Sequence, residues 1–284
     1  MKSFINQTRW PKLHVTVTCI LYWALFMLFL VATGLLVNTM IPPKWERFGY
    51  GITGTMAALL ATWIMLRFEN KSFADYGLTW RKNTIVKFAR GFLTGCGIFF
   101  LIIMILLLST DLTIGKPNKP WNPVSAFWYL SIIPLALMEE IAFRSYPFIK
   151  LNKIYGLRIT QIIIAIAFAL YHIIQGWDFQ IAFLGPAIWA FVFGLAAIWS
   201  KGIAVPTGIH VALNLIQQVL GMKGAGNGSI WELKYKTTES AESISQTDTM
   251  GIIIQLLVLV SAILFTEYYI RKNKNQPETV TSGY

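Results

Sequence analysis

The chain has 284 residues, of which 55% are hydrophobic and only 13% are charged, whereas soluble globular domains carry about 25% charged residues. The mean hydropathy of +0.56 is typical of a protein with several membrane spans. The net charge is +11, but the basic residues are scattered between apolar runs. This pattern fits loops that contact anionic lipid and argues against a nucleic-acid partner.

Apolar runs of about 20 residues, the length of a helix that crosses the bilayer core, occur repeatedly. They predict an all-α fold, a polytopic integral membrane bundle of about eight transmembrane helices around a polar intramembrane cavity. Gly185 and Pro186 predict a kink in the sixth helix. The expected spans are 14–37, 48–67, 88–109, 124–146, 158–176, 179–199, 201–220 and 250–270.

The first apolar run is about twice as long as a signal-peptide core, so we expect it to remain as a span. Most of the 24 Lys and Arg residues fall on the side of both termini, which predicts cytoplasmic termini. Cys19 and Cys96 both lie inside apolar runs, so we expect neither a disulfide framework nor a cysteine metal cluster. Residues 221–249 form the only long polar loop of this scheme.

Three charged residues lie at the end of the fourth expected span, in the stretch LMEEIAFRSY. An ionisable side chain at mid-membrane costs on the order of 3 kcal/mol and usually has a partner. Glu140 and Arg144 are four residues apart in the orientation that favours an ion pair, which predicts a structural role. Glu139 points about 100° away from that pair and needs a partner of its own.

Two histidines lie within later spans, and they supply candidate partners for Glu139. His172 lies in the fifth expected span, while His210 and Asn214 lie one turn apart in the seventh. Two schemes for amide hydrolysis follow. In the first, Glu139 activates a water that His172 orients, and His210 with Asn214 stabilises the oxyanion. In the second, His172, His210 and Glu139 bind Zn²⁺ or another divalent metal.

The three motifs resemble the signature of a known family. Glu139-Glu140-x-x-x-Arg144, Phe168-x-x-x-His172 and His210-x-x-x-Asn214 resemble those of the CPBP family, also called Abi, which contains the type II CAAX prenyl proteases and their bacterial relatives. The segment FADYGL before the third span resembles the short amphipathic lead-in of that family.

The resemblance implies three regions: spans one to three over 1–120, a protease-like core over 121–220, and a polar loop, last span and cytoplasmic tail over 221–284. It implies that Glu139 is the catalytic base, that Glu140 supports it, and that Arg144 is the ion-pair partner in the motif. It also implies that His172 shares the water and that His210 with Asn214 forms the oxyanion site. It also implies an intramembrane endopeptidase of a bacterial plasma membrane, with the bilayer and a peptide or lipid-modified protein as partners. The metal-dependent and metal-free schemes both remain open.

Two other functions use the same residues. A non-catalytic immunity or scaffold protein would bind a peptide in the cavity, and a proton-coupled transporter would use the intramembrane Glu and His. The expected span ends place Glu139 and His172 at different depths in the membrane. The two residues meet only if the fourth helix continues to about Lys150 or the fifth begins near Tyr155. We therefore expect a buried Arg144 and a cavity that opens to the cytoplasmic half of the membrane.

Overall fold

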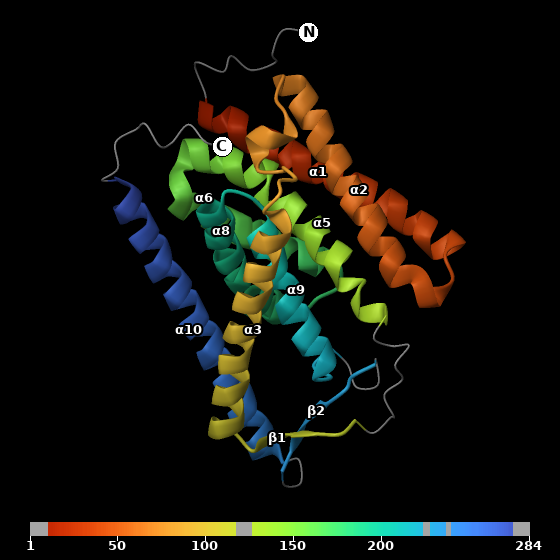
Figure 1. Cartoon of the computed structure of the whole chain (residues 1–284), viewed down its shortest axis with the longest axis vertical. Helices are drawn as coiled ribbons and strands as arrows, with labels where there is room; N and C mark the ends of the chain where they lie inside the picture. The colour runs from red at the N-terminus through yellow and green to blue at the C-terminus, as the bar shows by residue number, and fades with distance from the viewer. Residues whose placement is uncertain (1–10, 118–126, 224–227, 237–239, 275–284) are drawn as a thin grey trace.

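The structure is a computed structural model that describes residues 11–117, 127–223, 228–236 and 240–274. It is a bundle of helices with both described chain ends near one end and a small two-stranded sheet at the other (Figure 1). Its longer helices are α1 (Pro11–Met40), α2 (Glu46–Glu69), α3 (Thr84–Ser109), α5 (Ile132–Arg144), α6 (Tyr146–Ile174), α8 (Ile188–Ser200), α9 (Ala204–Val219) and α10 (Ala241–Lys274). Short helical turns occupy η1 (Pro43–Trp45), η2 (Phe73–Tyr76), α7 (Phe179–Ala182) and η3 (Phe183–Ala187).

The predicted all-α membrane bundle is confirmed. Six helical stretches of the described chain are long and apolar enough to cross a membrane. The fourth and fifth expected spans lie in one of them, Phe127–Ile174. The seventh expected span is α9, which has 16 residues. A count of eight spans therefore stays a prediction.

The junction between the fourth and fifth expected spans differs from the prediction. Helix α5 ends at Arg144, because Ser145 leaves the helical region with φ −97° and ψ −107°. A new helix, α6, begins at once at Tyr146, with Pro147 in its first turn, where the missing N–H of proline costs no hydrogen bond. Gly156, with φ +75° and ψ +167°, interrupts α6. The fifth helix thus restarts beside Tyr155, as one of the two alternatives predicts, and Arg144 is buried as expected.

The loop expected over 221–249 is shorter than predicted. Within it, strand β2 (Glu232–Tyr235) pairs antiparallel with β1 (Leu112–Gly115), and strands of four residues are too short to leave a clear alternation in the sequence. Helix α10 also begins earlier than residue 250, and its polar first turns follow Ser240, whose hydroxyl accepts the N–H of Ser243 at 3.1 Å. The predicted kink is confirmed, since Pro186 lies within the π-helical turn η3.

Glycines hold the helices that carry the polar residues in place. A β-carbon at Gly91 or Gly95 of α3 would overlap the backbone of α9, and one at Gly208 of α9 would overlap the backbone of α3. Gly54 of α2 leaves room for Met138 of α5 in the same way. Small residues allow helix backbones to approach closely in membranes. They place α9 against α3 and α5 against α2.

Candidate active site

The charged residues of the fourth expected span lie on α5, where Glu140 and Arg144 are buried. Nη1 of Arg144 lies 3.5 Å from Oε1 of Glu140, and both side chains are fully buried. The guanidinium also lies over the rings of Phe168, at 4.4 Å, and Phe193, at 5.1 Å. A cation over aromatic faces gains electrostatic stabilisation that partly replaces hydration. The predicted Glu140–Arg144 pair is therefore present in the structure.

His210 of α9 lies between the two adjacent carboxylates of α5. Its Nδ1–H donates to Oε1 of Glu140 at 2.8 Å. On the other side of the ring, Nε2 lies 3.6 Å from Oε2 of Glu139. The ring of Phe193 stacks on the imidazole at 4.7 Å and restricts its rotation. Helical spacing predicts Arg144 as the ion-pair partner of Glu140, and the structure adds His210 as a second partner.

His172 is fixed near the end of α6. Its Nδ1–H donates to the carbonyl of Phe168 at 2.8 Å, which in a neutral imidazole leaves Nε2 with a free lone pair. The rings of Phe168, Tyr171 and Trp177 meet the imidazole edge to face at 4.6, 5.2 and 4.9 Å. These four contacts fix the position and orientation of the His172 ring at the end of α6.

Asn214 has a partner that the sequence analysis missed. Nζ of Lys223, in the turn after α9, donates to Oδ1 of Asn214 at 2.7 Å. Burial, and then the charge of Arg47, lowers the pKa of Lys223 to about 8, against a smaller opposing effect of Glu139. Only the return of the chain after α9 brings this lysine to the site, so helical spacing gives no signal for it.

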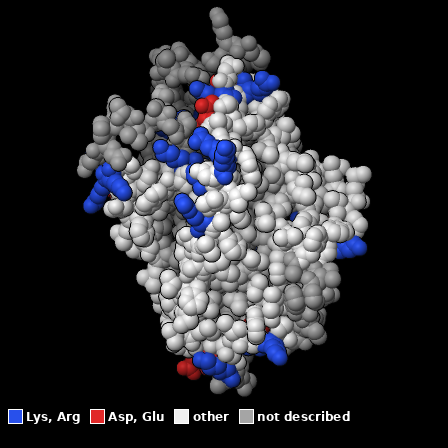
Figure 2. Space-filling model, viewed as in Figure 1, with Lys and Arg blue, Asp and Glu red and all other residues white. Residues whose placement is uncertain are grey.

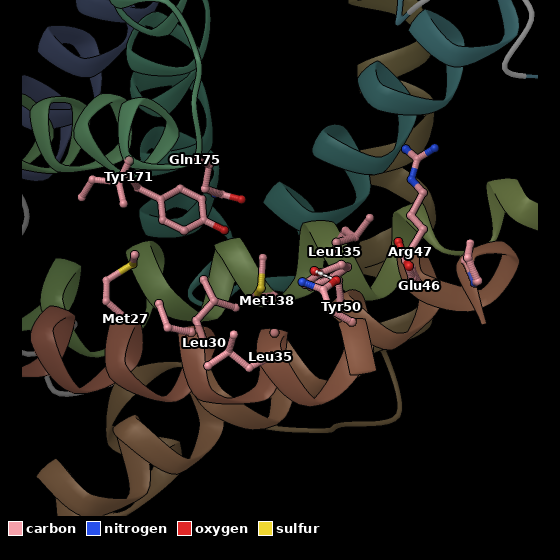
Figure 3. Close-up of a pocket in the computed structure, with 15 residues that line it drawn as sticks. Met27, Leu30, Leu35, Glu46, Arg47, Tyr50, Leu135, Met138, Tyr171 and Gln175 are labelled. Atoms are coloured by element: carbon pink, nitrogen blue, oxygen red, sulfur yellow. Dashed lines mark hydrogen bonds between the residues drawn. The ribbon is translucent and has the colours of Figure 1, made fainter. Parts of the chain in front are cut away.

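A cavity of about 610 Å³ lies between α1, α2, α5 and α6 (Figure 3). Met138 and Tyr171, which directly precede Glu139 and His172, line it together with Leu35, Asn38 and Arg47. The last two belong to the end of α1 and the start of α2. The cavity therefore lies toward the α1–α2 turn.

The metal alternative can be tested against the side chains present. Both histidines give their Nδ1–H to an acceptor, Glu140 or a backbone carbonyl, which leaves Nε2 as the ring nitrogen that could bind a metal. Among the residues that the structure describes, no three His, Cys, Asp or Glu side chains gather closely enough to hold a metal ion. The set of His172, His210 and Glu139 thus does not fit a metal site, and we derive no step through a metal.

Comparison with known proteins supports the family resemblance. A search of curated proteins gives no match to the chain. The family model described as "Type II CAAX prenyl endopeptidase Rce1-like" matches residues 120–216. This segment carries α5, α6, α8 and most of α9, and with them every charged or imidazole side chain of the motifs. Residues 120–216 of the chain are therefore similar to the Rce1-like type II CAAX prenyl endopeptidases.

Proposed function

We propose that the protein is an intramembrane endopeptidase that hydrolyses peptide bonds of membrane-associated peptides or of C-terminal protein segments. One observation carries the proposal, namely His210 held between the carboxylates of Glu139 and Glu140. The Rce1-like match brings lipid-modified C-terminal segments into the candidate substrate class. The cavity between α1, α2, α5 and α6, which Met138 lines, offers room for a short peptide segment.

Glu139 is the proposed general base. Its side chain is 16% exposed, while that of Glu140 is fully buried, so only Glu139 has access to water. Glu139 takes one proton from a water molecule as the water oxygen attacks the peptide carbonyl carbon. The free Nε2 lone pair of His172 accepts the other water proton in a hydrogen bond and orients the attack. The proton on Glu139 then passes to the leaving amine nitrogen as the C–N bond breaks.

His210 and Asn214 are the proposed donors to the tetrahedral oxyanion. In this scheme the ring of His210 carries a hydrogen on each nitrogen, so Nε2–H donates to the oxyanion while Nδ1–H stays on Glu140. Lys223 occupies Oδ1 of Asn214, so the amide presents its Nδ2 hydrogens to other partners. Fixed donors of this kind stabilise developing negative charge without reorganisation in the transition state.

Glu140 and Arg144 are proposed positioning residues. Glu140 fixes the ring orientation of His210 through a 2.8 Å hydrogen bond. Arg144 balances the charge of Glu140 in an apolar surrounding, where an unpaired carboxylate would be costly. Neither of them needs to touch the substrate in this scheme.

The proposal is tested by comparing membrane-peptide proteomes of cells that express the wild type or Glu139→Gln. We expect fragments that end at a common cleavage pattern only with the wild type. The exposed Glu242 of α10 supplies the matched control Glu242→Gln, which keeps the wild-type fragments. Identical proteomes would favour the non-catalytic peptide-binding alternative, and altered ion flux without fragments would favour the transporter.

A further inference from the structure

Two cations, Arg47 and Lys223, lie side by side along the last turns of α9. Arg47, in the first turn of α2, extends toward α9, where its Nη1 donates to Oε1 of Gln218 at 3.1 Å (Figure 3). Lys223 follows α9, and its Nζ donates to Oδ1 of Asn214 at 2.7 Å. Because Asn214 and Gln218 are one turn apart on the same helix, the two cations are neighbours.

No carboxylate neutralises this pair among the residues that the structure describes. Every ion pair in the described ranges joins other side chains, so no acidic oxygen lies within ion-pair distance of Arg47 or Lys223. Glu139 acts on Lys223 from beyond that distance, and its effect is smaller than that of Arg47. Both cations are half-buried, and burying a charge is costly unless an opposite charge joins it.

The C-terminus of α9 does not account for the two cations. Basic side chains often stabilise the end of a helix by donating to its last carbonyls. In this chain, the carbonyls of residues 216–220 all accept backbone N–H groups, at 2.9 to 3.4 Å. The chain itself therefore caps α9, and the helix end does not need Arg47 or Lys223 as hydrogen-bond donors.

Both cations lie where an expected span leaves the bilayer core. Arg47 directly precedes the expected span 48–67, and Lys223 closely follows the expected span 201–220. Most lysines and arginines of the described chain gather elsewhere, near the end that carries the termini (Figure 2). Arg47 and Lys223 are thus a local pair and not part of that large basic surface.

Aromatic side chains mark the start of α2 as a membrane interface. The ring of Trp45 contacts that of Trp128 at 4.9 Å, and the ring of Phe48 contacts it at 5.8 Å. Trp45 is 39% exposed, and tryptophan is enriched at the level of the lipid headgroups. Arg47 lies between Trp45 and Phe48 in the sequence, so its guanidinium is at the level of the lipid phosphates.

We propose that Arg47 and Lys223 bind the phosphate group of an anionic phospholipid. A phosphodiester carries one negative charge on two free oxygens, so it can accept from the guanidinium and from the ammonium together. Basic pockets between membrane helices bind acidic lipid headgroups. Phosphatidylglycerol fits the pair better than phosphatidylcholine, whose headgroup carries a cation of its own.

The bound headgroup also acts on the candidate active site. Lys223 holds Oδ1 of Asn214, so a phosphate that fixes Lys223 also fixes the amide that is the proposed oxyanion donor. Fixed donors stabilise a transition state better than mobile ones. This effect on cleavage rests on the proposed function, whereas the binding of the lipid does not.

Lipid retention tests the site without any need for cleavage. The wild type, Arg47→Gln and Arg81→Gln are reconstituted in vesicles of phosphatidylcholine with phosphatidylglycerol, released into mild detergent and analysed by native mass spectrometry. We expect the wild type to retain phosphatidylglycerol in excess of its share in the vesicles, and Arg47→Gln to lower that excess about fivefold. Arg81 is exposed in the turn before α3, so the control Arg81→Gln should keep the wild-type excess.

A second variant and a free anion sharpen this test. Lys223→Met should lower the excess as Arg47→Gln does, which covers the case in which Arg47→Gln fails to fold. An equal excess in the wild type and both variants would overturn the proposal. Phosphatidylglycerol should raise the Tm of the wild type, whereas inorganic phosphate added to phosphatidylcholine vesicles should not. An equal rise with inorganic phosphate would refute a lipid as the occupant.

Cleavage of a peptide found by proteomics separates the lipid site from the proposed function. The kcat of the wild type should be higher with phosphatidylglycerol than in phosphatidylcholine alone, while Arg47→Gln should have the same low kcat in both. Retention of phosphatidylglycerol without cleavage in either kind of vesicle would keep the lipid site and refute the protease. Equal cleavage in both, with no excess of retained phosphatidylglycerol, would refute the lipid site and keep the protease.

Discussion

His210 bridges two carboxylates that are neighbours in the sequence, with Nδ1 2.8 Å from Glu140 and Nε2 3.6 Å from Glu139. Adjacent residues on a helix point about 100° apart, so a ring placed between them can contact both. One carboxylate is buried and bound to Arg144, while the other is partly exposed. This difference in surroundings separates a positioning role from a chemical one.

Glu140→Gln should lower both stability and activity. The change leaves Arg144 buried without a counter-charge, and breaking a buried pair costs about 3–5 kcal/mol. It also weakens the hydrogen bond that orients His210. Thermal unfolding of the purified protein in detergent should show a lower Tm for Glu140→Gln, and the double variant Glu140→Gln with Arg144→Met should recover part of it. A Tm equal to that of the wild type would contradict the ion pair.

Lys223 should impose a pH limit on cleavage. Burial and the charge of Arg47 lower the pKa of Lys223 to about 8, so the ammonium is charged below that pH and neutral above it. Glu139, the remaining charged group in reach, opposes this shift. If the charge of Lys223 helps Asn214 to stabilise the oxyanion, kcat should fall as the pH rises through about 8.

The variants of Lys223 separate this effect from a loss of fold. Lys223→Arg keeps its charge and should move the alkaline limit upward, whereas Lys223→Met should lower kcat below about pH 8 to the level that the wild type has above it, and so remove the limit. Lys116→Met, at an exposed position of the same end, is the control and should keep the wild-type profile. An unchanged profile in Lys223→Met would show that this lysine has no part in the reaction.

The α3–α9 contact should be intolerant of any side chain at Gly95. A β-carbon there would lie 2.8 Å from the carbonyl oxygen of Ile209 and from Cβ of Ala212, so Gly95→Leu should displace α9 together with His210 and Asn214. Overpacking of this kind costs about 1–3 kcal/mol or more. Gly97→Leu on the same helix is the control, since a β-carbon at Gly97 meets nothing within 4 Å. Equal Tm and equal activity in the two variants would contradict the packing described for α9.

Removal of divalent metals should leave cleavage intact. The donor set of His172, His210 and Glu139 does not fit a metal ion, and the proposed base is a carboxylate. Activity should therefore survive dialysis against EDTA, and metal analysis of the active protein should find less than one equivalent of zinc. Loss of activity that returns with added Zn²⁺ would refute the glutamate scheme.

Much of the site could be predicted from the sequence because polar residues in an apolar helix are conspicuous. Of the motif residues, Glu139, Glu140 and Arg144 on α5 lie against His210 or against one another in the structure. The pairing of Glu140 with Arg144 also follows from helical spacing alone. The second partner of Glu140, His210, depends on the packing angle of α9 against α5, which spacing along one chain segment does not define.

Other features depend on long-range folding and left no local signal. Lys223 reaches Asn214 through a turn after the helix ends. The break at Ser145 separates two helices in a run whose hydrophobicity continues without interruption. The sequence therefore gives no sign that a second helix begins directly after Ser145.

The central claim is that Glu139 activates the attacking water, and one comparison tests it most directly. Purified wild type and Glu139→Gln are reconstituted in lipid vesicles, and cleavage of a peptide substrate found by proteomics is measured by mass spectrometry. Loss of a general base lowers rates by about 10²–10⁴-fold, so Glu139→Gln should retain at most about 1% of the wild-type rate at an unchanged Tm. A folded Glu139→Gln protein that cuts the peptide at the wild-type rate would contradict the mechanism.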